Sequence, residues 1–478
     1  MDIKRTVIDA LKWLSMARLL AQITRWCVTF IVIKLLSPSD YGVAALAQTV
    51  LALLELFTSL GLGAAVVQSK NISKRDLQII FGMIVTINTI LLIFLWVIAP
   101  IVSQFYDNPA LELILKVLSL NFVFIVLGSL PSSLLLRDMK FKAIALSEVI
   151  SGFCGAGVSL ALAYAGYGYW ALVLGGMSII ISRTIVQFIA NPVLIMPRFN
   201  FSEAKHFISF GGLIMASIIV RYLYVSLDVV IAGRVWTPET LGMYAVALQL
   251  AVLPLNKIMP MIRQVAFPAY SKTQSDPAKV RSYVVESMGL AMALAFPLFF
   301  GISSIASLLV PLLLGIKWQA ATLPITLLCM VIPFRMMLEL FEPALNATGN
   351  PRVVFNTSLR ILMFMVPTFL ISVRWDEVGL ALGWLVVFPL LSLYSCSGYC
   401  RELKIPFMTM LRAIKSPVLC SSLMLVSVTF YIQQLESSMP QWTLLISAIA
   451  LGGMLYVLLI FISSRSLFNR YKSVLQRR

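Results

Sequence analysis

The sequence predicts an all-α integral membrane protein of about 14 transmembrane helices, built as two six-helix lobes plus two C-terminal helices. Three observations predict this class. The first is composition: 60% of the 478 residues are hydrophobic and 12% are charged, with a mean hydropathy of +0.94, which a water-soluble fold could not hide from solvent. The second is a series of apolar windows of spanning length. The third is the alternation of basic residues between the loops.

The apolar windows set the expected helices, because a spanning helix needs about 20 predominantly apolar residues. They lie at residues 9–36, 41–66, 77–103, 110–135, 143–165, 168–190, 207–234, 239–263, 282–314, 319–346, 353–373, 377–400, 413–433 and 442–464. Short turns rich in Pro, Asp, Asn or Gly separate several windows, near Ser37, Tyr106, Gly166 and Asp376. The first window carries charge and lacks a cleavage pattern, so we expect it to remain in the mature protein.

Lys and Arg residues alternate between the predicted loops. One set of alternate loops, together with both chain ends, holds nearly all of the loop Lys and Arg residues, whereas the other set holds only Lys317 and Arg374. Cytoplasmic loops of membrane proteins retain Lys and Arg. The split therefore predicts an even number of helices and places both termini in the cytoplasm.

An internal repeat predicts how the helices are grouped. The segment IKLLSPSDYGVAALA from Ile33 matches GRVWTPETLGMYAVA from Gly233 at an offset of 200 residues. An even number of helices between the copies makes the halves parallel repeats, related by an axis along the membrane normal. We therefore expect an N-terminal six-helix lobe at residues 1–200 and a C-terminal six-helix lobe at 201–405. Residues 406–478 are expected to form two additional helices and a basic cytoplasmic tail.

Composition and motifs also exclude several classes of function. The net charge of +17 is accounted for by the membrane loops, so we do not expect a nucleic-acid partner. No Walker A phosphate loop, nucleophile elbow or long loop occurs, which argues against an enzyme. The six cysteines form no CxxC pair and His206 is the single histidine. We therefore predict neither a metal site nor a cofactor.

Charged residues also occur inside the apolar windows. The candidate site residues are the basic Arg18, Arg25, Arg221, Lys257 and Arg335 and the acidic Glu55, Asp228, Glu339 and Glu342. A charged residue costs about 2.5 to 3.5 kcal/mol at the centre of a transmembrane helix, so we expect these side chains to face the bundle interior or a watery cavity. Positions three, four or seven apart share a helical face, which puts Arg335, Glu339 and Glu342 on one stripe.

Two interpretations of these charges stay open. In the first, the five basic residues line a cationic central cavity, because an anionic diphosphate needs Arg or Lys to replace its hydration. In the second, the charges form ion pairs that tie helices together, with Arg221 and Asp228 pairing in their own helix or Arg335 with Glu339. The four acidic residues are candidates for proton or sodium coupling, or for pairing with the arginines.

Several segments resemble a known family. They are LSPSDYGVAALA from Leu36, GLGAAVVQ from Gly61, PSSLLLRDMKFKAIALSEVISG from Pro131, YGYWALVLG from Tyr167, LDVVIAGRVWTPETLGMYAVA from Leu227, FPAYSK from Phe267 and LLGIKW from Leu313. In order and spacing they resemble polysaccharide exporters of the lipopolysaccharide O-unit flippase and colanic acid exporter type. This family lies within the multidrug/oligosaccharidyl-lipid/polysaccharide superfamily. After Gly349 the likeness is only one of hydropathy.

The resemblance implies a function that composition alone does not give. It implies two lobes around a central cavity that export an oligosaccharide repeat on undecaprenyl diphosphate across the bacterial inner membrane, for O-antigen, capsule or exopolysaccharide synthesis. Membrane lipids, and the polysaccharide polymerase machinery, would be its partners. The alternatives are a lipid II flippase or drug exporter of the same superfamily and, in a different class, a membrane polymerase or ligase. Such enzymes are expected to have a sizeable external loop, and every external loop here is short.

Overall fold

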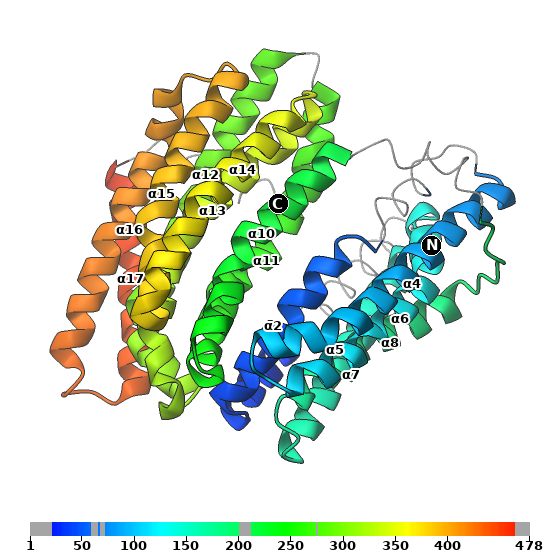
Figure 1. Cartoon of the computed structure of the whole chain (residues 1–478). Helices are drawn as coiled ribbons and strands as arrows, with labels where there is room; N and C mark the ends of the chain where they lie inside the picture. The colour runs from blue at the N-terminus through cyan, green and yellow to red at the C-terminus, as the bar shows by residue number, and fades with distance from the viewer. Residues whose placement is uncertain (1–21, 59–65, 67–71, 200–211, 274–275, 464–478) are drawn as a thin grey trace, which may run out of the picture. The chain divides into compact units, whose positions relative to one another are not determined.

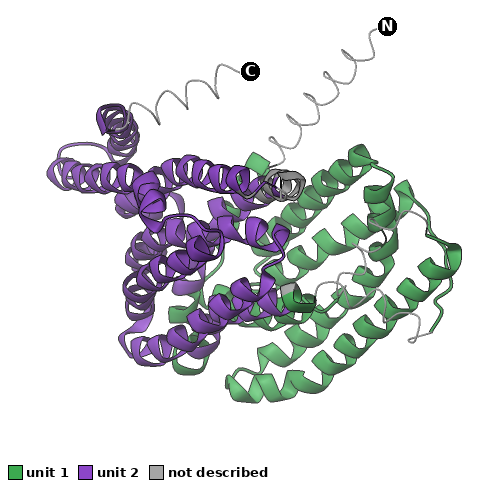
Figure 2. Cartoon of the chain, turned by 90° about the horizontal axis from the view of Figure 1, so that it is seen from above, with its two compact units in different colours: residues 1–215, 232–242 green, residues 216–231, 243–478 purple. Residues whose placement is uncertain are grey.

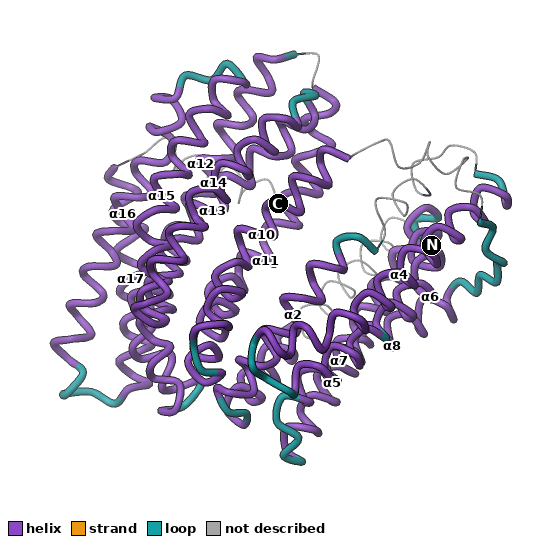
Figure 3. Tube along the Cα trace, viewed as in Figure 1, coloured by secondary structure: helices purple, strands orange, loops and turns teal. Residues whose placement is uncertain are grey.

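A computed structural model describes residues 22–58, 66, 72–199, 212–273 and 276–463. Every regular element among these residues is a helix (Figures 1 and 3), so the prediction of an all-α protein is confirmed. The chain splits into two compact units (Figure 2). Unit 1 comprises Met1–Met215 and Ala232–Gly242, and unit 2 comprises Ala216–Ile231 and Met243–Arg478.

Unit 1 is a bundle of helices. Its described helices are residues 22–35, α2 (Pro38–Glu55), α4 (Lys74–Phe105), α5 (Ala110–Ser119), α6 (Asn121–Arg137), α7 (Phe141–Tyr164) and α8 (Trp170–Ala190). The most extensive packing is between α7 and α8, with α6 against α8 and α4 against α5.

Unit 2 holds most of the second half of the chain. Its elements are α10 (Gly212–Val235), α11 (Pro238–Thr273), α12 (Pro277–Leu313), the 3₁₀ turn Ile316–Ala321, α13 (Thr322–Ala347), α14 (Pro351–Ser372), the 3₁₀ turn Val373–Trp375, α15 (Asp376–Glu402), α16 (Phe407–Leu435) and α17 (Gln441–Ser463). The strongest packing joins α12 to α16 and α13, and α13 to α15. The ends of α10 and α11 that face their shared turn belong to unit 1.

Capping residues mark the start of two helices, and the predicted turns separate helices. Ser37 caps α2 in a capping box with Asp40, and Ser73 caps α4 in the same way with Asp76. The turns predicted near Ser37, Tyr106, Gly166 and Asp376 all separate helices in the structure. The last of these has a positive φ of 51° at Asp376, a conformation that stops a helix from running on.

One predicted helix is divided in two. The window 110–135 contains α5 and α6, which are separated at Leu120. The backbone of Leu120 stays right-handed helical, at φ −62° and ψ −20°, so the chain continues in nearly the same direction. The hydroxyl of Ser119 donates to the carbonyl oxygen of Lys116 at 2.6 Å, and such a bond bends a helix.

The two copies of the internal repeat cross at a pair of glycines within unit 1. A Cβ atom placed on Gly42 of α2 would lie 1.9 Å from the carbonyl oxygen of Pro238, and one on Gly242 of α11 would lie 1.7 Å from that of Pro38. The contact is therefore reciprocal: each glycine meets the proline that begins the other copy's helix. No side chain fits at either position without moving backbone.

Eleven helical segments of the described residues are long and apolar enough to cross a bilayer, and one of them, Pro351–Glu402, contains both α14 and α15. Apolar side chains on α4, such as Ile93, Val97 and Ile101, are more than half exposed, which suits a lipid-facing surface. The chain is therefore a multi-pass membrane protein. The count of fourteen helices stays a prediction, since part of the first window lies outside the described residues.

Candidate functional site

Two basic and two acidic side chains meet inside unit 2. Arg335, Glu339 and Glu342 lie on one face of α13, at the spacing that the sequence indicated. Nη1 of Arg221, on α10, lies 3.7 Å from Oε2 of Glu339 and 3.9 Å from Oε1 of Glu342. Nε of Arg335 lies 3.6 Å from Oε1 of Glu339. We call these four residues the charge tetrad.

The charge tetrad is shielded but still accessible. The side chains of Arg221 and Glu342 are 20% and 19% exposed, and those of Glu339 and Arg335 are 10% and 16% exposed. Among the described residues, neither guanidinium donates a hydrogen bond, and Nε of Arg335 is buried without an acceptor. A guanidinium has five N–H donors, so both arginines keep unused hydrogen-bonding capacity.

Two buried tyrosines lie beside the charge tetrad, and sequence reasoning missed both. Tyr224 of α10 packs its ring 6.3 Å from that of Phe388 on α15, and Tyr399 of α15 packs 5.4 Å from Phe341 of α13. Both tyrosines are electrostatic neighbours of Arg221. The three-residue spacing from Arg221 could have indicated Tyr224, whereas no local signal connects Tyr399 with α10.

Asp228 forms a separate polar site in unit 2. Its Oδ2 accepts hydrogen bonds from the Tyr244 hydroxyl at 2.6 Å and from Nε1 of Trp384 at 2.8 Å, and its Oδ1 accepts from the Val229 N–H at 2.7 Å. The fully buried carboxylate thus joins α10 to α11 and α15. The hypothesis that Asp228 pairs with Arg221 is wrong, because two helical turns separate them by about 10 Å along the axis and each binds partners on other helices.

Arg25, the predicted cavity residue on the helix 22–35, packs against α7 in unit 1. Its Nη2 donates to Oε1 of Gln22 at 2.7 Å. A Cβ atom on Gly152 would lie 2.8 Å from Cδ of Arg25, so this glycine leaves the space that the arginine occupies. Glu148 and Arg183 are its electrostatic neighbours. The described helix 22–35 contains no Asp or Glu, so the acidic neighbour of Arg25 comes from α7.

The other predicted site residues are Arg18, Glu55 and Lys257. Arg18 lies outside the described residues. Glu55 is half-buried near the end of α2, and Lys257 is exposed on α11. Substrate contact or ion coupling at these positions stays a prediction.

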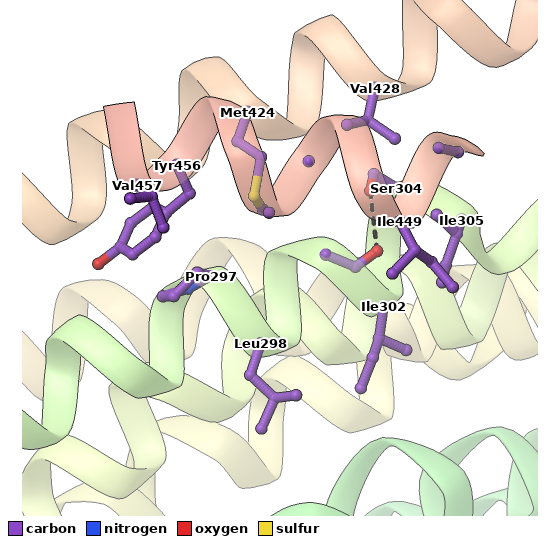
Figure 4. A pocket seen from close by; sticks show the side chains of 14 residues that line it. Pro297, Leu298, Ile302, Ser304, Ile305, Met424, Val428, Ile449, Tyr456 and Val457 are labelled. Carbon is purple, nitrogen blue, oxygen red and sulfur yellow. Dashed lines mark hydrogen bonds between the residues drawn. The ribbon is translucent and has the colours of Figure 1, made fainter. Parts of the chain in front are cut away.

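An apolar cavity of about 400 Å³ lies between α12, α16 and α17 (Figure 4). Its lining includes Pro297, Met424 and Tyr456. The hydroxyl of Ser304, which also faces it, already donates to the carbonyl oxygen of Gly301 at 2.8 Å, and that of Tyr456 donates to Ala293 at 2.7 Å. This cavity therefore offers no free polar group to a charged ligand.

In the part of the chain that the structure describes, no three His, Cys, Asp or Glu side chains lie close enough together to hold a metal ion. Cys396 and Cys400, four residues apart on α15, are both buried, which suits packing. The lack of a cofactor stays a prediction.

The sequence matches one protein family and several named relatives. The family model described as "polysaccharide biosynthesis protein" matches residues 31–323. The lipopolysaccharide biosynthesis protein WzxC of Escherichia coli K12 is 24% identical over 394 residues, covering 81% of this chain and 79% of that protein. The succinoglycan biosynthesis transport protein ExoT of Rhizobium meliloti is 25% identical over 458 residues, covering 92% and 90%.

Two solved structures share the fold at low sequence identity. The lipid II flippase MurJ in an inward closed conformation aligns with a TM-score of 0.75 at 15% identity, covering 95% of this chain and 99% of that one. A multidrug resistance MATE family transporter in an inward-facing conformation aligns with a TM-score of 0.58 at 15% identity, covering 81% and 98%. Both matches show that this chain shares the helical fold of those two structures.

Proposed function

Because the chain belongs to the polysaccharide biosynthesis protein family, we propose that it is a flippase for polyprenyl-diphosphate-linked oligosaccharide repeat units. It moves the repeat across the bacterial inner membrane by alternating access, to supply surface polysaccharide synthesis. The observation that carries this proposal is the family match over residues 31–323, more than half of the 478-residue chain. The same match confirms the resemblance to polysaccharide exporters predicted from the sequence.

The relatives support transport over enzymatic synthesis. ExoT is named as a transport protein of succinoglycan biosynthesis, and MurJ, which shares the fold, is named as a flippase of lipid II. The membrane-spanning helices of this chain suit a lipid-linked cargo, whose tail stays in the bilayer while its sugars cross. A polysaccharide polymerase would then receive the exported repeat.

The architecture that goes with this function has fourteen helices in two six-helix lobes, residues 1–200 and 201–405, around a central cavity. Residues 406–478 add two helices and a basic tail, and both termini lie in the cytoplasm. The internal repeat supports the lobes, and the loop distribution of Lys and Arg supports the orientation. Rocking of two such lobes about the cargo would expose it to each face in turn.

The basic residues inside the helices supply the contact with cargo. A diphosphate needs cationic donors to replace its water, and guanidinium groups bind phosphate oxygens bidentately. Arg25 and Arg221 suit this role, with Arg18, Lys257 and Arg335 as further candidates. Asp228, Glu339, Glu342 and Glu55 are the candidates for ion coupling or for pairing with these cations.

Complementation tests the proposal. A bacterium lacking this gene is supplied with wild type, Arg25→Ala, Arg221→Ala or the control Arg374→Ala, an exposed residue between α14 and α15. Surface polysaccharide and accumulated lipid-linked repeats are scored at matched membrane abundance. We expect wild type and the control to export, whereas the other two variants lose surface polysaccharide and trap repeats on the cytoplasmic side.

Other outcomes assign other roles. Full export by both arginine variants would leave these residues as structural ion pairs. Surface polysaccharide that is unchanged in the deletion strain would refute the proposed cargo, and arrested cell-wall synthesis in that strain would point to lipid II. Lipid-linked repeats that reach the outer face but stay unpolymerised in the deletion strain would favour a polymerase.

A further inference from the structure

The arginines of the charge tetrad need an anion whether or not cargo is bound. A charged side chain inside a membrane bundle is costly unless it is paired. In the structure, Glu339 contacts both Arg221 and Arg335, and Glu342 contacts Arg221. The two carboxylates therefore stand where anionic oxygens of a ligand would stand if these arginines bound one.

The pairing in the charge tetrad is loose. Its three N···O separations are 3.6, 3.7 and 3.9 Å, whereas a charge-assisted hydrogen bond measures about 2.7–2.9 Å. Glu339 and Glu342 therefore neutralise the arginines without using up the N–H donors of the two guanidinium groups.

The backbone beneath Glu339 favours movement of the carboxylate. Pro343 lies inside α13, four residues after Glu339. Proline has no N–H, so the carbonyl oxygen of Glu339 loses its usual intrahelical donor, and the helix can bend at this point. Glu342, next to the same proline, is also partly exposed. An incoming anion can therefore reach Arg221, and the carboxylates can give way.

We propose that Glu339 and Glu342 are exchange anions: they hold Arg221 and Arg335 when no cargo is bound, and the cargo's diphosphate displaces them. This inference rests on the proposed function and deepens it. The exchange keeps the arginines paired throughout the cycle and weakens the hold on cargo. A carrier needs that weakness, because it must release what it binds.

Binding by the purified full-length chain tests the exchange. Farnesyl diphosphate serves as the probe and farnesol as its uncharged analogue, titrated against protein in lipid nanodiscs. The variants are Glu342→Gln, Arg221→Ala and the control Glu436→Gln, an exposed carboxylate at the end of α16. Thermal unfolding of each protein is recorded alongside.

We expect Glu342→Gln to bind farnesyl diphosphate on the order of tenfold more tightly, because it loses one competing charge. Arg221→Ala should bind it more weakly, and Glu436→Gln should match wild type. Glu342→Asp keeps the charge but shortens the side chain by one methylene, so its gain in affinity for farnesyl diphosphate should be smaller. This variant replaces Glu342→Gln in the test if the glutamine variant is unstable. A purely structural carboxylate predicts no gain in affinity for either substitution.

The exchange is overturned if folded Glu342→Gln and Glu342→Asp bind the diphosphate no more tightly than wild type. The exchange is also overturned if wild type binds farnesyl diphosphate no better than farnesol. If wild type nevertheless restores export, the proposed function stands. Conversely, Glu342→Gln could bind the diphosphate more tightly although the wild-type chain fails to restore surface polysaccharide. That result would support anion exchange and refute only the proposed cargo.

Discussion

Replacing Gly242 by alanine tests the close crossing of α2 and α11. The new Cβ atom would lie 1.7 Å from the carbonyl oxygen of Pro38 and 2.6 Å from its carbonyl carbon. A carbon normally approaches a carbonyl oxygen to about 3.3–3.6 Å, so one helix must move by roughly 1.5–2 Å. Both clashing atoms belong to backbone, so no side-chain rotation relieves the contact.

The expected cost follows from overpacking. Inserting a methyl group into a well-packed contact destabilises by about 1–3 kcal/mol, and alanine's better helix propensity offsets up to about 1 kcal/mol. We therefore expect Gly242→Ala to be less stable than wild type. Gly42→Ala should behave alike, because its Cβ would lie 1.9 Å from the carbonyl oxygen of Pro238. The double variant should cost less than the sum, since one displacement relieves both clashes.

Gly176→Ala is the matched control, because this glycine lies in α8 and a Cβ there meets no atom within 4 Å. The assay is thermal unfolding of the purified variants in one detergent, followed by intrinsic fluorescence. Gly176→Ala should unfold at the wild-type temperature or above it, and Gly242→Ala below it. If Gly242→Ala and Gly176→Ala unfold together, the inferred backbone contact is wrong.

Three further substitutions have definite expectations. Tyr244→Phe leaves Asp228 short of one buried hydrogen bond and should destabilise unit 2 by about 1–3 kcal/mol, measured by thermal unfolding; an unchanged midpoint would contradict that bond. Arg234→Ala breaks an exposed pair with Asp107 and should cost less than about 1 kcal/mol in the same assay, so a larger loss would show that the pair is not solvent-screened. The backbone N–H of Lys279 donates to Asp276, the N-cap of α12, and lowers the pKa of that carboxyl, so its stabilisation is present above the ordinary pKa of about 3.9 and is lost as pH falls through the lowered value. Hydrogen-exchange protection at the start of α12, taken relative to the intrinsic exchange rate at each pH, should therefore fall in acid for wild type but not for Asp276→Asn, and an equal fall in both proteins would refute this.

Local signals in the sequence were sufficient for much of the fold. Apolar windows and Pro, Asp and Gly turns depend on residues close together in the chain, and the turns near Ser37 and Asp376 lie where they were predicted. The stripe of Arg335, Glu339 and Glu342 likewise needs only helical periodicity. The division of 110–135 into α5 and α6 was missed, because no Pro or Gly marks Leu120.

The candidate site could be predicted only in part. Periodicity selected Arg221 and the α13 stripe, but it also left open a pairing of Asp228 with Arg221, because sequence spacing cannot show which neighbouring helix a side chain faces. Tyr399 was missed for the same reason, since it lies far along the chain from the arginine that it accompanies.

The sequence by itself determined the membrane class, the helical segments and the family, because these follow from composition, short-range periodicity and ordered motifs. Tertiary structure alone decided the partner of each buried charge and the atoms that make the repeat copies touch. Arg221 binds Glu339 of α13, and Gly42 and Gly242 meet each other's prolines. The physical reason is that such contacts depend on the rotation and separation of helices distant in sequence, which packing of the whole bundle sets.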